Sequence, residues 1–437
     1  MARMGLQRFW RALGPGLVTG AADDDPSGIA TYSQAGAQFG YALTWTMFLT
    51  LPFMAAIQII SAWIGWQTRQ GLARNISRTF PAPVLLALVA LLVVANTINI
   101  AADLAAMGEA LRLVIGGPQI FYALMFGAIC LVLEVWLPYH RYAGLLKFLA
   151  LVLLTYVAAA FSVKIPWGEV LRATFIPTMS LDRDMILTIV AVFGTTISPY
   201  LFFWQASQEA EESRLSHRYK HAKNSHAKAS HATTSHTTAA DRAGHFNHIS
   251  TDTWIGMAFS NSVAFFIIVT TAATLHVAGI TKVDTAAQAA EALRPIAGNL
   301  AFALFSIGII GTGLLAVPVL AGSAAYAAAE TFGLRGSLEL PASRALGFYA
   351  IVGAATLGGA ALTATNIDAI TMLFWSAVIN GVAAVPIMAA MMWVVTYGDG
   401  AHALALPRWI KILGWLATAL MTLAVGLLIW SSLGGKA

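Results

Sequence analysis

The sequence predicts an all-α membrane protein that crosses the bilayer many times and forms a single transmembrane domain over residues 1–437. Three observations predict this fold class. The chain is 58% hydrophobic and only 10% charged, a composition typical of polytopic membrane proteins. Its apolar stretches form eleven candidate spans, most near or above the ~20 residues that a helix needs to cross a bilayer. Two of these spans contain a proline beside polar residues, so we expect the first and sixth of eleven helices to be broken.

The spans follow one another with short connections and one long interruption. We place helices 1–5 within about 13–163, helices 6–10 within about 185–396 and helix 11 at about 409–432. The individual apolar stretches lie near residues 13–40, 43–65, 84–112, 118–137, 143–163, 185–207, 252–276, 296–330, 345–364, 369–396 and 409–432.

The first span is interrupted by three adjacent acids, Asp23, Asp24 and Asp25, which Pro26 follows. An aspartate at the centre of a lipid-facing helix costs roughly 3 kcal/mol, so three in a row must face protein or water. Pro26 removes a backbone donor and clashes with the preceding turn, so we expect the helix to break there. A broken helix at membrane depth is tolerated where it lines a cavity, and acids at such a break indicate a cation site in a transporter.

The sixth span contains a second proline, Pro199, within the run Gly194-Thr-Thr-Ile-Ser-Pro-Tyr200. Hydroxyl groups of this run, such as those of Thr195 and Ser198, can coordinate a cation or donate hydrogen bonds. Two proline-interrupted spans in matching places of two five-helix halves predict an inverted repeat with its binding site at the two breaks. Two kinked packing helices are the alternative, but a kink alone would not need Asp25.

A polar, low-complexity segment, 213–251, separates the sixth and seventh spans. We interpret it as a flexible, His-rich cytoplasmic loop. Because clustered imidazoles bind transition metals, capture or sensing of a cytosolic metal is the alternative. Seven of the ten histidines lie here: His217, His221, His226, His231, His236, His245 and His248.

The distribution of lysine and arginine predicts the orientation. Most of the 25 basic residues fall in segments on the side of the N-terminus, including Arg69, Arg74 and Arg335. By the positive-inside rule the N-terminus is then cytoplasmic and the C-terminus outside, in a multi-pass protein of the inner (plasma) membrane. The net charge of +5 is thus a topology signal, and it forms no patch for nucleic acid. The single cysteine, Cys130, allows no internal disulfide and is expected to be a buried thiol.

Eight runs spread along the chain form a pattern that is specific when taken together. They are Gly14-Pro-Gly16, Asp25-Pro-Ser-Gly28, Gln34-Ala-Gly-Ala37, Ala101-Ala-Asp-Leu104, Gly194 to Tyr200, Ala272-Ala-Thr-Leu-His276, Leu304-Phe-Ser-Ile-Gly308 and Ala321-Gly322. On these residues the chain resembles the NRAMP family of divalent-metal transporters over nearly its whole length. The resemblance implies a LeuT-like fold, in which helices 1–5 and 6–10 form inverted repeats, and transport of a divalent cation.

The metal-binding positions that the resemblance implies are Asp25, Gly28, Thr195 and Ser198. Only Asp25 keeps the family's residue type, because Gly28 stands in the place of an asparagine ligand and Ser198 in the place of a methionine ligand. Thr195 stands where the family has an alanine that binds through its carbonyl. Further residues expected around the site or along the ion path are Asp23, Asp24, Asp103, Tyr200 and Asn380.

These substitutions change which ion the site suits. A thioether favours softer transition metals, whereas carboxylate, hydroxyl and carbonyl oxygens suit Mg²⁺ and Mn²⁺. A roomy, acidic site that offers only oxygen also suits an ion that keeps several waters, as Mg²⁺ does. We therefore expect Mg²⁺ to be the first substrate and Mn²⁺ the second, and the chain resembles most the NRAMP-related magnesium transporters.

Proton coupling is not expected from this sequence. A relay needs a chain of titratable groups. Asp103 remains in the third helix, but Asn96 and Ala106 stand where the family pattern has acids, and Tyr200 replaces a histidine. A tyrosine does not titrate near neutral pH.

The expected substrate is a divalent ion, in contact with a protein embedded in lipid, with no cofactor, no nucleic acid and no obligate protein partner. No catalysis is implied, and the chain has no nucleotide-binding loop. Three other functions stay open. They are a proton-coupled Mn²⁺/Fe²⁺ importer, a LeuT-like cation-coupled importer of a small organic solute, and a metal receptor that does not transport.

Overall fold

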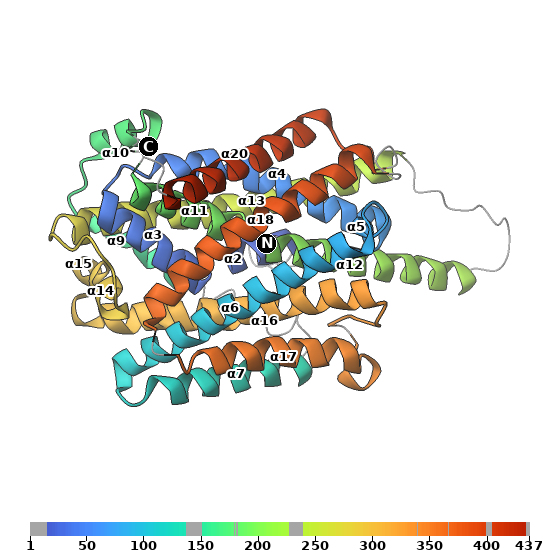
Figure 1. The fold of residues 1–437 in the computed structure, drawn as a ribbon, viewed down its shortest axis with the longest axis horizontal. Helices are drawn as coiled ribbons and strands as arrows, with labels where there is room; N and C mark the ends of the chain where they lie inside the picture. Colours follow the sequence, from blue (N-terminus) through green and yellow to red (C-terminus); the bar gives the residue numbers. More distant parts are fainter. Residues whose placement is uncertain are drawn as a thin grey trace, which may run out of the picture.

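The computed structural model describes residues 15–136, 151–178, 180, 182–226, 239–338, 340–365, 367–398 and 404–433. Within these ranges the chain is helical and contains no strand. Figure 1 shows long helices side by side, most of them running along the longest axis of the molecule. The prediction of an all-α polytopic protein is confirmed.

The elements succeed one another in the order that the apolar stretches predicted. In the first half they are α2 (Pro15–Asp23), α3 (Pro26–Phe39), α4 (Trp45–Thr68), α5 (Leu72–Ile76), α6 (Ala82–Ile115), α7 (Gln119–Trp136), η1 (Leu151–Leu153), α9 (Leu154–Ser162) and α10 (Trp167–Phe175). In the second half they are α11 (Arg183–Thr196), α12 (Pro199–His226), α13 (Ala239–Thr271), η2 (Ala272–His276), α14 (Ala286–Glu291), α15 (Arg294–Ala297), η3 (Gly298–Leu300), α16 (Ala301–Phe332), η4 (Ala342–Arg344), α17 (Leu346–Leu362), α18 (Ala369–Tyr397) and α20 (Arg408–Ser432).

Eight helices of the described ranges are long and apolar enough to cross a membrane. The other three expected spans are shorter for identifiable reasons. The first is divided into α2 and α3, and the ninth is the apolar helix Leu346–Leu362. The fifth, near 143–163, is described from residue 151 onwards, where η1 and α9 lie. In the described ranges, each apolar stretch of the sequence contains a helix or a pair of half-helices.

The breaks lie where the prolines predicted them. α2 ends at Asp23 and α3 starts at Pro26, because a proline is favoured in the first turn of a helix and disfavoured in its interior. α11 ends at Thr196 and α12 starts at Pro199 for the same reason. Asp25 caps α3 by accepting a hydrogen bond from the N–H of Gly28.

The half-helices are held in the middle of the bundle by close contacts. α2 and α3 pack against α13, and α11 packs against α18. A Cβ placed on Gly194 would lie 2.1 Å from the carbonyl oxygen of Ala377 and 2.5 Å from the backbone nitrogen of Gly381. Only glycine fits at 194, so α11 and α18 touch at backbone distance immediately before the second break. α6 packs on α16, and α7 and α17 lie together along the lower edge of Figure 1.

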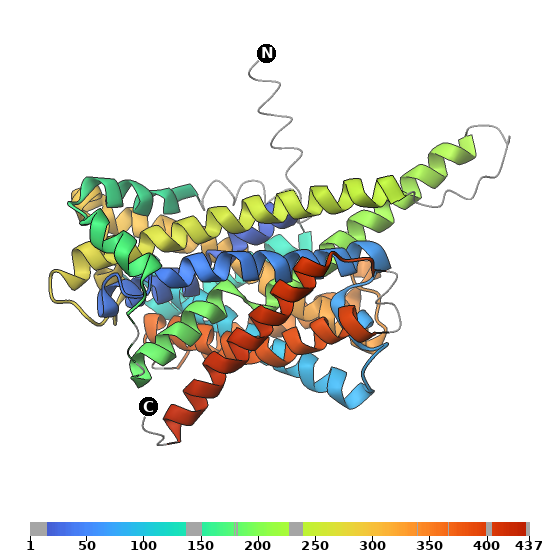
Figure 2. The same ribbon diagram turned by 90° about the horizontal axis from the view of Figure 1, so that it is seen from above.

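The segment 213–251 differs from the predicted loop. α12 continues as a helix to His226 and α13 already begins at Ala239, so much of the segment is helical. The reason is that polar residues with good helix propensity follow Pro199 without a glycine or proline until Gly244. In Figure 2 the ends of both helices project beyond the other helices. His231 and His236 lie outside the described residues, and the ring of His245 packs on Trp66 with centroids 4.7 Å apart.

The start of α11 lies outside the apolar span and is fixed by Asp182. Its carboxylate accepts a hydrogen bond of 2.9 Å from the N–H of Met185, and the hydroxyl of Ser180 donates to its other oxygen. These bonds, that of Ser180 foremost, lower the pKa of Asp182, because they stabilise its ionised form. The capped helix then runs without interruption to Thr196.

Candidate metal centre at the two helix breaks

The two breaks are joined directly by Tyr200. Its hydroxyl, at the start of α12, donates a hydrogen bond of 3.0 Å to the carbonyl oxygen of Ala22 in the last turn of α2. The same hydroxyl lies 3.4 Å from Oδ2 of Asp25. Tyr200 is fully buried. The sequence prediction that the two proline breaks meet at one place is therefore consistent with these contacts.

The Asp25 carboxylate is at the centre of this junction. Its Oδ1 accepts hydrogen bonds from the hydroxyl of Ser27 at 2.6 Å and from the N–H of Gly28 at 2.8 Å. Its Oδ2 accepts from the side-chain amide of Asn99 at 3.2 Å. Asp25 is 1% exposed, and it is held by its own turn, by α6 and by α12. A carboxylate fixed from three directions can present its remaining lone pairs to a cation in one orientation.

Gly28 and Thr195 face each other across the breaks. A Cβ placed on Gly28 would lie 3.2 Å from Oγ1 of Thr195 and 3.2 Å from the ring of Tyr32. The Thr195 hydroxyl also lies 3.5 Å from that of Ser27. A larger residue at position 28 would therefore press on Thr195. The structure brings together Asp25, Gly28, Thr195 and Tyr200 from the predicted set.

The Ser198 hydroxyl is directed to its own helix. It lies 2.8 Å from the carbonyl oxygens of both Gly194 and Thr195, and its single hydrogen is used there. Ser198 thus satisfies carbonyls that the end of α11 leaves free. A cation at the break could still approach its lone pairs.

The other predicted residues lie in separate surroundings. Asp23 and Asp24 point to α13, where both carboxylates contact Ser260. Asp103 is fully buried on α6, and neither of its carboxylate oxygens has a hydrogen-bond partner among the described residues. Asn380 is fully buried on α18 and likewise has no partner for its amide within the described part of the chain.

The donor set at the breaks is made of oxygen. In the described ranges no group of three or more His, Cys, Asp and Glu side chains could hold a metal ion. One carboxylate, hydroxyls and backbone carbonyls are what the junction offers. Hard cations such as Mg²⁺ and Mn²⁺ prefer such ligands, and Mg²⁺ needs only one or two carboxylates because it keeps several waters.

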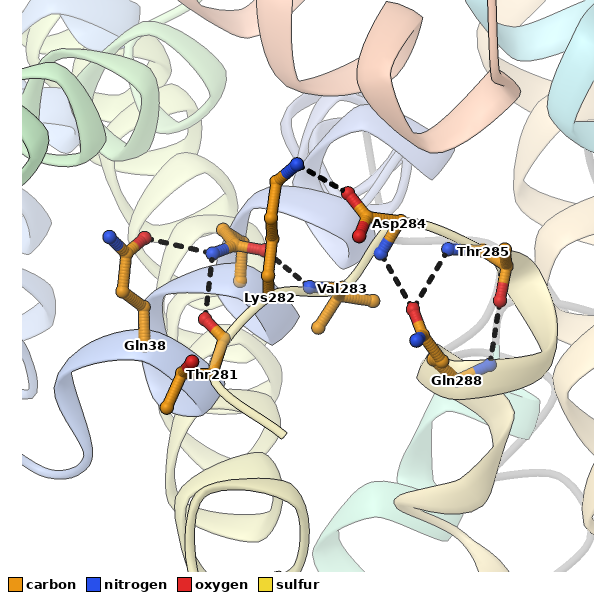
Figure 3. A network of polar contacts seen from close by, with 8 residues as sticks. Gln38, Thr281, Lys282, Val283, Asp284, Thr285 and Gln288 are labelled. Carbon is orange, nitrogen blue, oxygen red and sulfur yellow. Dashed lines mark hydrogen bonds and ion pairs between the residues drawn. The ribbon is translucent and has the colours of Figure 1, made fainter. Parts of the chain in front are cut away.

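Two cavities lie at opposite ends of the bundle. One, of about 430 Å³, is lined by Ala30 and Gln34 of α3, by Asp184 of α11, by the 281–284 loop and by α18. Figure 3 shows this loop fastened to α3, because Gln34 accepts from the N–H of Val283 at 2.8 Å and donates to the carbonyl of Thr281. The other, of about 530 Å³, is lined by Gly71, by α12, by α16 and by the segment after α16, with Arg214 and Glu330 among its residues.

Sequence reasoning missed three residues at these sites, namely Asn99, Ser27 and Ser260. Asn99 is the partner of Asp25 from a helix that contains no break. A polar residue inside a long apolar helix, four residues before Asp103 and hence on the same face, was the available signal. Nothing in the sequence indicated which serine of α13 would meet the acids.

Comparisons with known proteins agree with this architecture. A family model named Nramp, described as natural resistance-associated macrophage protein-like, matches residues 16–431. The divalent metal cation transporter MntH of Yersinia enterocolitica is 30% identical over 316 residues, which cover 69% of this chain and 68% of that protein. MntH of Verminephrobacter eiseniae is 27% identical over 320 residues, 71% of this chain and 66% of its own length.

Solved structures resemble this fold at low sequence identity. A manganese transporter of Eremococcus coleocola superposes with a TM-score of 0.72 at 16% identity, over 99% of this chain and 89% of that one. A nucleobase-cation-symport-1 family transporter superposes with a TM-score of 0.55 at 14% identity, over 96% and 93% of the two chains. The predicted LeuT-like arrangement with two broken helices is thereby confirmed.

Proposed function

Since the chain belongs to the Nramp family, whose model spans residues 16–431, we propose that it carries a divalent metal cation across the membrane, Mg²⁺ first and Mn²⁺ second. The relatives named MntH are divalent metal cation transporters, and this supports the class of substrate. The proposed ligands are the Asp25 carboxylate together with oxygens of Gly28, Thr195 and Ser198.

The observation that carries this proposal is the junction of Asp25, Gly28 and Thr195. Asp25 is buried and oriented by four contacts, so it can supply the single negative charge of the site. Opposite it, Gly28 contributes no side chain and Thr195 a hydroxyl. A serine at position 198 offers no sulfur, so nothing there favours a soft ion over Mg²⁺.

We propose that transport proceeds without proton coupling along the third membrane-spanning helix, which is α6. Asn96 is engaged in packing, because its amide donates to the carbonyl of Leu320 at 2.9 Å and to the hydroxyl of Ser323 at 2.7 Å. The Tyr200 hydroxyl is engaged with Ala22. The alternative, a proton-coupled Mn²⁺/Fe²⁺ importer, is favoured by one observation: Asp103 is a buried carboxyl group without a described partner.

We further propose that the protein resides in the inner (plasma) membrane with its N-terminus in the cytoplasm and its C-terminus outside. The cavity bordered by Arg214 and Arg335 then opens inward. The cavity bordered by Asp184 and the 281–284 loop then opens outward. This arrangement agrees with the positive-inside rule.

Uptake into proteoliposomes tests the function. The purified full chain is reconstituted, and influx of Mg²⁺, Mn²⁺, Ca²⁺ and amino acids is measured separately against empty liposomes. We expect saturable Mg²⁺ influx, weaker Mn²⁺ influx and no amino-acid influx. Absence of any metal influx from a protein that still binds the ion would mean that the chain is a receptor. Influx of Mn²⁺ alone would overturn the Mg²⁺ preference.

A further inference from the structure

The first half-helix, α2, is fastened to α13 by contacts that recur every four residues. The N–H of Gly16 donates to Oδ2 of Asp252 at 2.7 Å. One turn further, a Cβ on Gly20 would lie 2.4 Å from the backbone of Gly256. One turn further again, the acids that end α2 contact Ser260. The equal spacing on both helices brings them to backbone distance and directs the acids into α13.

The pair Asp23 and Asp24 is buried without compensation. The exposed fractions of the two residues are 0% and 1%, and Ser260 is fully buried beside them. The Ser260 oxygen lies 2.6 Å from Oδ2 of Asp23 and 3.0 Å from Oδ1 of Asp24. A hydroxyl has one proton and can donate to one of them at a time. The outer oxygens, Oδ1 of Asp23 and Oδ2 of Asp24, have no partner among the described residues.

No positive side chain in the described part of the chain offsets this charge. The charged groups that act on Asp23 and Asp24 are other carboxylates, Asp25 included. Buried carboxylates are stable in proteins when they are paired or when they coordinate a metal. Two of the four carboxylate oxygens, Oδ1 of Asp23 and Oδ2 of Asp24, therefore have neither a hydrogen-bond donor nor a positive partner among the described residues.

Tyr32 is an independent indication of a ligand at this place. It belongs to α3, across the break, and it is fully buried. Its hydroxyl lies near Thr196, and the charged groups that act on it are Asp23, Asp24 and Asp25. The hydroxyl has no hydrogen-bond partner within the usual distance and angle among the described residues. A buried phenol held near two acids without a partner presents a free oxygen lone pair to the same space.

We propose that Asp23, Asp24 and Ser260 form a second divalent-cation site, with the Tyr32 hydroxyl facing it, beside the proposed site at Asp25. Two carboxylates and two hydroxyls, completed by water, are a ligand set for Mg²⁺ or Mn²⁺. The site connects the end of α2 to α13, so a bound ion holds α2 against that helix. The choice of ion rests on the proposed function, whereas the position of the site rests on the contacts above.

Binding stoichiometry separates the two sites. The full chain is purified in detergent, and Mn²⁺ serves as the probe because free and bound Mn²⁺ are distinguished by electron paramagnetic resonance. The variants are Asp25→Ala, the double variant Asp23→Asn with Asp24→Asn, and Ser260→Ala. The matched control is Ser262→Ala, because Ser262 is exposed on the same helix and its hydroxyl donates to Ala258 of that helix.

We expect two Mn²⁺ per wild-type chain, one in Asp25→Ala and one in the double variant. Ser260→Ala should weaken one of the two sites about tenfold, because it removes a hydroxyl ligand and the hydrogen bond that orients the two carboxylates, and Ser262→Ala should leave both unchanged. One Mn²⁺ in wild type and none in Asp25→Ala would overturn the second site and leave the proposed function standing. No bound Mn²⁺ in wild type would overturn both. If the double variant does not fold, Ser260→Ala decides, and an unchanged titration then counts against the proposal.

Discussion

The side-chain amide of Asn99 donates a hydrogen bond of 3.2 Å to Oδ2 of Asp25, and it thereby joins the unbroken helix α6 to the break of the first helix. The other carboxylate oxygen of Asp25 is held within its own turn, by Ser27 and Gly28. Oδ2 is thus the oxygen whose direction depends on neighbouring helices. Whatever moves α6 relative to α3 changes how Asp25 is presented.

Asn99→Ala is expected to weaken Mg²⁺ binding by about 10- to 100-fold, the usual effect of losing a residue that orients a metal ligand. Isothermal titration of the purified protein measures it. The matched control is Asn96→Ala on the same helix, whose amide donates to Leu320 and Ser323 and makes no described contact with Asp25. The control should lose stability and keep its affinity within about twofold. Equal loss of affinity in both variants would mean that α6 acts only through packing.

The sequence predicts the positions of the helix breaks and the order of the spans, but not the side-chain contacts at the breaks. Pro26 and Pro199 predict the breaks because each proline stands beside polar residues. Pro52, Pro318 and Pro386 lie among apolar residues inside helices that continue, so a proline alone does not end a helix in this chain. The order of the spans follows in the same way from apolar length. Which side chains meet at the breaks could not be predicted. Asp23 is the last residue of α2, and Asp24 and Asp25 lie between the half-helices, where no periodicity assigns a direction. The three acids therefore divide between Asn99 on one side and Ser260 on the other.

At the end of α12 the prediction of secondary structure from apolar content is wrong. Low apolar content predicted a loop from residue 213, yet α12 reaches His226. A helix of polar residues has no face to bury, so hydropathy does not detect it, while its propensity remains high in the absence of glycine and proline.

Asp25→Ala should reduce uptake to the background of empty liposomes while the protein still inserts and elutes as a single species. The reason is that Asp25 supplies the proposed site with its only charge. Radiolabelled Mn²⁺ influx into proteoliposomes measures the effect, with Ser262→Ala as an exposed control. Influx like that of wild type would refute the assignment of the site to the break.

Metal uptake is expected to leave the internal pH of the vesicles unchanged. Asn96 and Tyr200 are occupied by fixed hydrogen bonds, which leaves Asp103 without a titratable neighbour at these two positions. A pH-sensitive dye inside the vesicles, with the membrane potential clamped, records any proton flux during Mg²⁺ or Mn²⁺ influx. Proton influx in fixed ratio to metal would show that Asp103 suffices, and Asp103→Asn should then abolish it.

The connection between α12 and α13 should be dispensable for transport. Replacing residues 227–238 with a short Gly/Ser linker keeps both helices as the structure describes them. Uptake should stay within about twofold, because the free-energy cost of changing the length of a connection between two helices is small. The linker variant is compared with a double variant, His231→Ala with His236→Ala, in the full-length chain. Collapse of uptake in the linker variant and in the double variant, at normal expression, would assign these histidines a role in transport.

The double variant Gly28→Asn with Ser198→Met should shift preference from Mg²⁺ toward Cd²⁺. A thioether selects by softness, so Cd²⁺ should gain most, and a hydrated Mg²⁺ ion should lose the room for its waters. We expect the ratio of Mg²⁺ to Cd²⁺ affinity to fall at least about tenfold, which corresponds to about 1.4 kcal/mol. Competition binding of the two ions to wild type and variant measures this ratio.

Crowding at position 28 must be separated from the change of ligands in this experiment. A Cβ there lies 3.2 Å from Thr195 Oγ1, so the asparagine displaces that hydroxyl. Adding Thr195→Ala to the double variant relieves the crowding without restoring a hard ligand, so the shift toward Cd²⁺ should persist or grow. Ser198→Met alone should produce most of it, because the methionine brings the sulfur and replaces a hydroxyl bound to Gly194 and Thr195. An unchanged ratio in a well-folded double variant would place selectivity elsewhere, with Asp23 and Asp24 as the next residues to test.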